Sequence, residues 1–164
     1  MAHNPVNHPL RPIYRALAAL TGGYLIVFGV AGIIANSGQD FFATTGERVL
    51  GQGANLFWSI IALIIGAVVL VTAVLGRNLD TAADTYLGWA LLVIGSYGLA
   101  TARTDANFLG FTIATVVVTY LAGLVLIMAG LYVKTAPLSE TGAPGQVRES
   151  MTMEAVMITK VRPV

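Results

Sequence analysis

Four long stretches of this sequence contain no charged residue, and this segregation limits the possible folds more than any other feature. The stretches are residues 16–35, 54–75, 86–102 and 108–133. Only 10% of all residues are Asp, Glu, Lys or Arg, whereas a soluble domain has about 25%, mixed through its sequence. A helix rises about 1.5 Å per residue, so about 20 residues match the roughly 30 Å hydrocarbon core of a bilayer. The sequence therefore predicts four transmembrane segments.

Each apolar stretch is predicted to be a helix. Lipid offers no hydrogen-bond partner to an unpaired backbone amide, so only helices and closed barrels cross it. No stretch alternates apolar and polar residues with a period of two, as barrel strands do. The connections are short and make consecutive helices antiparallel. We therefore predict an all-α membrane protein, with four transmembrane helices in an up-down-up-down bundle over residues 16–133.

The cationic residues predict the orientation of this bundle. Residues 1–15 contain three prolines and are predicted to form an extended tail, and residues 134–164 form a second tail. With four spans, both tails lie on the same face. That face contains seven Lys and Arg residues against two on the other, and cations concentrate on the cytoplasmic side. We expect a multi-pass protein of the inner (plasma) membrane with both termini in the cytoplasm.

The four spans lack the residue types that carry chemistry. None contains Asp, Glu, Lys, Arg, His or Cys, and intramembrane ionisable residues are the usual mark of proton relays and ion paths. His3 and His8 lie in the first tail, and Asp80 and Asp84 are predicted to cap and solvate the start of the third helix rather than bind an ion. The sequence predicts no catalytic, cofactor-binding or metal site, and therefore no enzyme.

Small residues recur at helical spacing within the spans, and such faces allow helices in lipid to approach closely. Nine glycines are predicted to serve helix packing or a partner interface: Gly22, Gly23, Gly29, Gly32, Gly66, Gly95, Gly98, Gly123 and Gly130.

The sequence also contains a faint internal echo. Ala54-Asn55 opens the second helix, Ala106-Asn107 opens the fourth, and Gly29 and Gly32 of the first resemble Gly95 and Gly98 of the third. The echo is consistent with a duplicated hairpin, but the offsets between these pairs differ. The alternative is that both asparagines are N-caps, which accept hydrogen bonds from free amides of the first helical turn.

The second tail is too apolar to be purely solvated and too short to form a core. Methionine suits adaptable contacts, so we expect this tail to become ordered against a partner subunit. The alternative is that it lies on its own bundle or on lipid headgroups. The predicted docking residues are Met151, Met153, Met157, Ile158 and Val161.

Several loop and cap sequences have a recognisable wording. They are Pro9-Leu10-Arg11-Pro12, Gly23-Tyr24, Phe28-Gly29, Gly51-Gln52-Gly53-Ala54-Asn55, Gly76-Arg77-Asn78 and Arg103-Thr104-Asp105-Ala106-Asn107. Over about residues 9–133 the chain thereby resembles a family of small four-helix membrane proteins from actinobacteria. Some members of this family are similar to CtaJ, an accessory subunit of the aa(3)-type cytochrome c oxidase in the cytochrome bcc–aa(3) respiratory supercomplex. The resemblance implies no catalytic residues.

Two functional hypotheses follow. The first is a non-catalytic accessory subunit of the respiratory supercomplex, on the cytochrome c oxidase side, that contacts other membrane subunits and lipids and binds no nucleic acid or cofactor. The second is a free-standing small transporter or lipid-handling protein, for which the spans supply little polar pathway. A membrane enzyme would have to use loop carboxylates, and these show no recognisable spacing.

Overall fold

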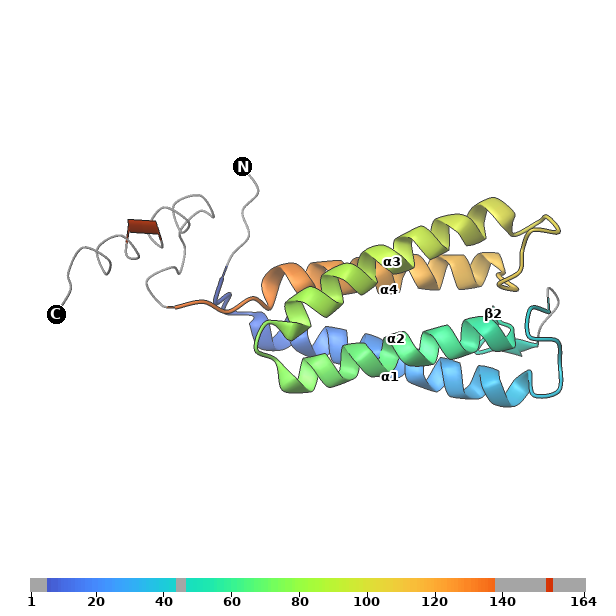
Figure 1. The fold of residues 1–164 in the computed structure, drawn as a ribbon, viewed down its shortest axis with the longest axis horizontal. Coiled ribbons are helices and arrows are strands. Elements are labelled where there is room, and N and C mark those ends of the chain that lie inside the picture. Colours follow the sequence, from blue (N-terminus) through green and yellow to red (C-terminus); the bar gives the residue numbers. More distant parts are fainter. Residues whose placement is uncertain (1–5, 44–46, 138–152, 155–164) are drawn as a thin grey trace.

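The computed structural model describes residues 6–43, 47–137 and 153–154. It contains four helices, α1 (Arg11–Ala35), α2 (Leu56–Leu75), α3 (Leu79–Thr101) and α4 (Ile113–Tyr132). Two short antiparallel strands, β1 (Arg48–Val49) and β2 (Gln52–Gly53), lie in the connection between α1 and α2. Figure 1 shows α1 and α2 as one hairpin and α3 and α4 as a second hairpin laid against it. The predicted all-α, four-helix bundle is confirmed.

Three of the helices are long and apolar enough to cross a membrane. The mean hydropathy of their most apolar segments is 2.1 in α1, 2.7 in α2 and 2.3 in α4. Large apolar side chains cover their outer faces; Leu20 of α1, for example, is 71% exposed and Val74 of α2 is 74% exposed. These helices indicate a multi-pass membrane protein.

Within each hairpin, the two helices are packed together through close glycine contacts. A Cβ atom placed on Gly66 of α2 would lie 2.6 Å from the carbonyl oxygen of Gly22 of α1. A Cβ atom on Gly88 of α3 would lie 2.8 Å from the carbonyl oxygen of Gly123 of α4. Within each hairpin, therefore, the backbones of the two helices touch, and any side chain at these positions would push them apart.

The glycine part of the predicted echo extends to a third position. Gly22, Gly29 and Gly32 of α1 recur in α3 with identical spacing, as Gly88, Gly95 and Gly98. All six are buried. The hairpins are therefore built on the same plan, whichever sequence history produced them.

The predicted starts of the first and fourth helices need correction. Helix α1 begins at Arg11, so the last part of the predicted tail is helical; Pro12 is tolerated because the first turn has no use for its missing amide hydrogen. Helix α4 begins at Ile113 with Thr112 as its N-cap. The prediction that Asn107 is the N-cap is therefore wrong. Asn107 instead holds the preceding turn, where its side chain pairs with the backbone N–H and C=O of Phe111.

Asn55 is the N-cap of α2, as predicted, and it also joins two loops. Its Oδ1 accepts a hydrogen bond from the Trp58 amide at 2.9 Å. Its Nδ2 donates to the carbonyl oxygens of Ala43, at 3.2 Å, and Phe108, at 2.7 Å. One buried amide thus ties the α1–α2 connection to the α3–α4 connection. We call this end of the bundle the distal end, and the end where α1 begins and α4 finishes the proximal end.

The glycine contacts make a direct stability prediction. Gly66→Ala should lower the free energy of unfolding by about 1–3 kcal/mol, and with it the midpoint of thermal unfolding, because the new methyl group overlaps the backbone of α1. Gly23→Ala is the matched control, since a Cβ at Gly23 meets nothing within 4 Å. It should be neutral or slightly stabilising because alanine favours the helix. Equal losses in detergent-purified protein would contradict this packing.

Candidate functional site

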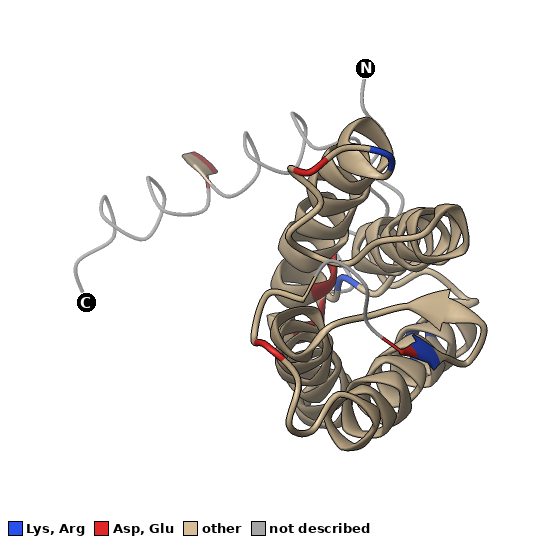
Figure 2. Ribbon diagram, turned by 90° about the vertical axis from the view of Figure 1, so that its right-hand side faces the viewer, with Lys and Arg blue, Asp and Glu red and all other residues tan. Residues whose placement is uncertain are grey.

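A buried polar cluster lies at the proximal end, where α1, α2 and α3 meet. The chain turns from α2 into α3 through Gly76, Arg77 and Asn78, all with φ between 58° and 64°. This tight turn starts α3 at Leu79, so Asp80 and Asp84 lie within the helix. Seen along the bundle in Figure 2, some acidic and basic stretches lie near the middle of the ring of helices, and others lie on loops around it.

Asp80 is fully buried and has two partners. Its Oδ1 accepts a hydrogen bond from the Thr81 amide at 3.0 Å, and its Oδ2 lies 3.9 Å from Nε of Arg15 in α1. Asp80 is also in the first turn of α3, where the helix dipole favours a negative charge. Both the arginine and the helix N-terminus favour negative charge at this position.

Arg15 belongs to the cluster because it also completes the end of α2. Its Nε donates to the carbonyl oxygen of Ala73, and its Nη2 donates to that of Val74 at 2.8 Å. The last carbonyl groups of a helix have no partner within the helix, so Arg15 supplies one from α1. The same cation thus joins the ends of three helices.

Asp84 is fully buried, and among the described residues neither of its carboxylate oxygens has a hydrogen-bond partner. Oδ2 of Asp80 and Oγ1 of Thr81 are likewise buried without such a partner. Burial and, to a smaller extent, the neighbouring charge of Asp80 together raise the pKa of Asp84 to about 7. Asp84 precedes the apolar segment 86–102, and its carboxyl group can be protonated or ionised near neutral pH.

The prediction that Asp80 and Asp84 are solvated is therefore wrong. The sequence interpretation began the third helix at residue 86 and left both carboxylates outside it. Extended back to Leu79, the helix places them on its buried stripe, which continues through Gly88, Leu91 and Gly95. That regular spacing is the sequence signal that could have identified them.

The predicted glycines mostly face their own bundle. Apart from Gly23, each has atoms of a neighbouring helix or loop within 4 Å of a Cβ placed on it. Gly29 and Gly32 face Ser59 of α2, and Gly130 faces Thr85 of α3. Gly95 and Gly98 face Tyr120 and Phe111. Of the predicted set, Gly23 is the position that leaves room for another molecule.

Little of the tails lies within the described residues. Met153 is described and is 66% exposed, whereas Met151, Met157, Ile158 and Val161 lie outside the described residues, as does His3. His8 packs against Tyr14 and Tyr132, with ring centroids 5.8 and 5.1 Å away.

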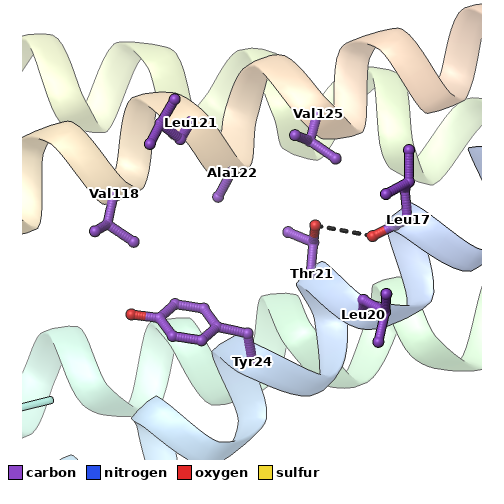
Figure 3. A pocket seen from close by; sticks show the side chains of 8 residues that line it. All are labelled: Leu17, Leu20, Thr21, Tyr24, Val118, Leu121, Ala122 and Val125. Carbon is purple, nitrogen blue, oxygen red and sulfur yellow. Dashed lines mark hydrogen bonds between the residues drawn. The ribbon is translucent and has the colours of Figure 1, made fainter.

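Two apolar clefts separate the hairpins. The larger, of about 440 Å³, lies between α1 and α4 (Figure 3). Its lining residues are Leu17, Leu20, Thr21, Tyr24, Val118, Leu121, Ala122 and Val125. The other, of about 320 Å³, lies between α2 and α3 near the distal end and is lined by Phe57, Trp58, Ile61, Val93, Ile94, Tyr97, Phe108 and Leu109.

Comparison with known proteins identified no relative. No family model, no curated protein and no solved structure matches this chain.

The double role of Arg15 makes a testable prediction. Arg15→Met should lower the free energy of unfolding by about 1–3 kcal/mol, because it leaves Asp80 buried without its cation and removes the donor to two carbonyl groups. The midpoint of thermal unfolding should fall accordingly. Adding Asp80→Asn should recover part of this loss, since a neutral amide needs no cation. Arg103→Met, at an exposed position, is the control. Strictly additive effects of the two substitutions would show that Arg15 and Asp80 do not interact.

Proposed function

We propose that this chain is a non-catalytic accessory subunit of a larger membrane complex, and that its α1–α4 cleft receives a transmembrane helix of a partner. In this proposal residues 86–102 form the fourth crossing segment and both termini lie in the cytoplasm. The observation that carries the proposal is the cleft itself, an apolar concavity formed by two helices that are apolar enough to lie in a bilayer.

The cleft has the shape that suits a helix. Thr21 and Ala122 lie between larger side chains, among them Leu20, Leu121 and Tyr24 (Figure 3). Small residues flanked by large ones accept a ridge of side chains and let helices in lipid approach closely. The polar groups of the lining already have partners: Thr21 donates to the carbonyl oxygen of Leu17 at 2.9 Å, and the Tyr24 hydroxyl accepts from Gln52. An apolar partner surface therefore fits best.

The resemblance of residues 9–133 to the actinobacterial family supports a specific partner. We propose the cytochrome c oxidase side of the respiratory supercomplex, in which haems and coppers would belong to neighbouring subunits. The tail residues Met151, Met153, Met157, Ile158 and Val161 would provide a second, cytoplasmic contact. Stabilisation of assembly, of subunit contacts or of bound lipids is the role that such a position allows.

A second function, a small free-standing transporter, is favoured by one observation. Asp80 and Asp84 are buried at the start of α3, just before its apolar segment, and buried ionisable residues of membrane proteins often mark ion and proton pathways. Reconstitution separates the two functions. Substrate or ion flux by the purified chain alone, abolished by Asp84→Asn, would favour transport over the accessory role.

Filling the cleft should release the partner. Purification in a mild detergent through a tag on this chain should recover oxidase or bcc subunits. Val118→Trp places a large ring in the cleft and should reduce this recovery several-fold. Val117→Trp is the matched control, because Val117 is the neighbouring residue, is 50% exposed and does not line the cleft.

Two outcomes would contradict the accessory role. One is recovery of the unmodified chain without any partner subunit. The other is an equal loss of partners from both variants while each remains monodisperse on size-exclusion chromatography, which would place the contact elsewhere.

A further inference from the structure

The unpaired polar atoms of this bundle are concentrated in one place. Among the described residues, five buried side-chain nitrogen or oxygen atoms lack a hydrogen-bond partner, and four of them belong to Asp80, Thr81 and Asp84. On a helix, residues three and four positions apart are neighbours, so Asp84 lies next to both Asp80 and Thr81. Buried polar groups in proteins are almost always paired. Four unpaired oxygens on neighbouring side chains therefore point to a proton or another cation as a ligand of this cluster.

The charge balance of the cluster points the same way. Helices α2 and α4, which pack against this part of α3, contain no charged residue, and α1 contributes Arg15 at 3.9 Å from Asp80. The other cations at the proximal end are engaged or exposed: Nε of Arg11 donates to the carbonyl oxygen of Val133 at 2.8 Å, and Arg77 faces outward.

The remaining titratable groups near this end pack among themselves or are only partly buried. Tyr14 and Tyr132 stack on each other with ring centroids 4.8 Å apart, and His8 packs against both. Lys134 is half-buried beyond the end of α4. Among the described residues, Arg15 is the cation that an ion pair joins to the cluster. With both carboxylates ionised, the cluster would therefore hold one negative charge without an ion-pair partner, which is costly in a buried site.

We propose that Asp84 and Asp80 bind one proton between them, as a carboxylic acid–carboxylate pair whose remaining charge is balanced by Arg15. The proton comes from solvent and adds to the Asp84 carboxylate, and the resulting O–H donates to Oδ2 of Asp80. The added proton thus gives a hydrogen-bond partner to Oδ2 of Asp80 and to the protonated oxygen of Asp84, both of which are otherwise unpaired.

A proton fits this site better than a metal ion does. The unpaired oxygens have essentially no accessible surface, and a proton requires no space, whereas metal ions need several oxygen ligands or retained waters. One positive charge also neutralises the site, while a divalent ion beside Arg15 would leave an excess of positive charge. The raised pKa of Asp84, about 7, agrees with a proton held near neutral pH.

The proton links the two hairpins. Arg15 belongs to the α1–α2 hairpin and both carboxylates belong to the α3–α4 hairpin. Loss of the proton puts a second negative charge between them. Because the folded state raises the pKa of Asp84, it binds more protons than the unfolded state between the ordinary aspartate pKa and about 7. Stability should therefore fall as pH rises through that window and level off above it.

Infrared spectroscopy of the full chain in liposomes tests this inference directly. The carbonyl stretch of a protonated carboxyl group is separate from that of a carboxylate. The wild type should show a protonated carboxyl band that disappears as pH rises through about 7. Asp84→Asn should lack the band, and Asp40→Asn, at an exposed position, should retain it. Size-exclusion chromatography and circular dichroism would verify that each variant is folded.

Two further variants test the pairing with Asp80 and Arg15. Asp80→Asn should move the midpoint of the band to lower pH, because it removes the neighbouring negative charge. Arg15→Gln should move it to higher pH, because it removes the balancing cation. Absence of the band in folded wild-type protein near pH 6, or its persistence in Asp84→Asn, would overturn the proposal. So would loss of the band when sodium chloride replaces choline chloride at constant pH, since the site would then prefer a metal ion.

Discussion

The ends of the helices impose the constraint on which much of this structure depends. The last carbonyl groups of a helix have no partner within that helix and must find one elsewhere. At the proximal end, α1 provides them: Arg15 donates to the carbonyl oxygens of Ala73 and Val74 in α2, and Arg11 donates to that of Val133 after α4. Once Arg15 is drawn into the bundle, the burial of Asp80 follows as compensation for its charge.

Glycine contacts decide which helices pack most closely. Because Gly22 and Gly66 bring α1 and α2 together, and Gly88 and Gly123 do the same for α3 and α4, the tightest packing is within each hairpin. The hairpins meet over less intimate surfaces, and the two apolar clefts lie between them. A partner helix in one cleft and a proton at the proximal cluster would thus both act on the interface between the two hairpins.

Sequence reasoning succeeded where the signal is local. The four charge-free stretches indicated four helices, and Asn55, at the start of one of them, indicated its N-cap. It failed where a local signal had two interpretations. Asn107 resembles an N-cap but closes a turn, and Thr112 caps α4. Asp80 and Asp84 resemble solvated residues because aspartate is rarely buried, and only the turn through Arg77 and Asn78 places them inside α3.

The sequence by itself determined that this chain has lipid-compatible helices, roughly where they lie and that they pack through small residues. Solvent alone decides these properties, because a bilayer core excludes charge and unpaired amides along each stretch independently of the others. Tertiary structure decided which glycines meet, where the clefts form and that Arg15 meets Asp80 beside an unpaired Asp84. These contacts depend on the rotation of each helix about its own axis. When a helix is apolar on every side, its hydropathy pattern does not indicate which face meets a neighbouring helix.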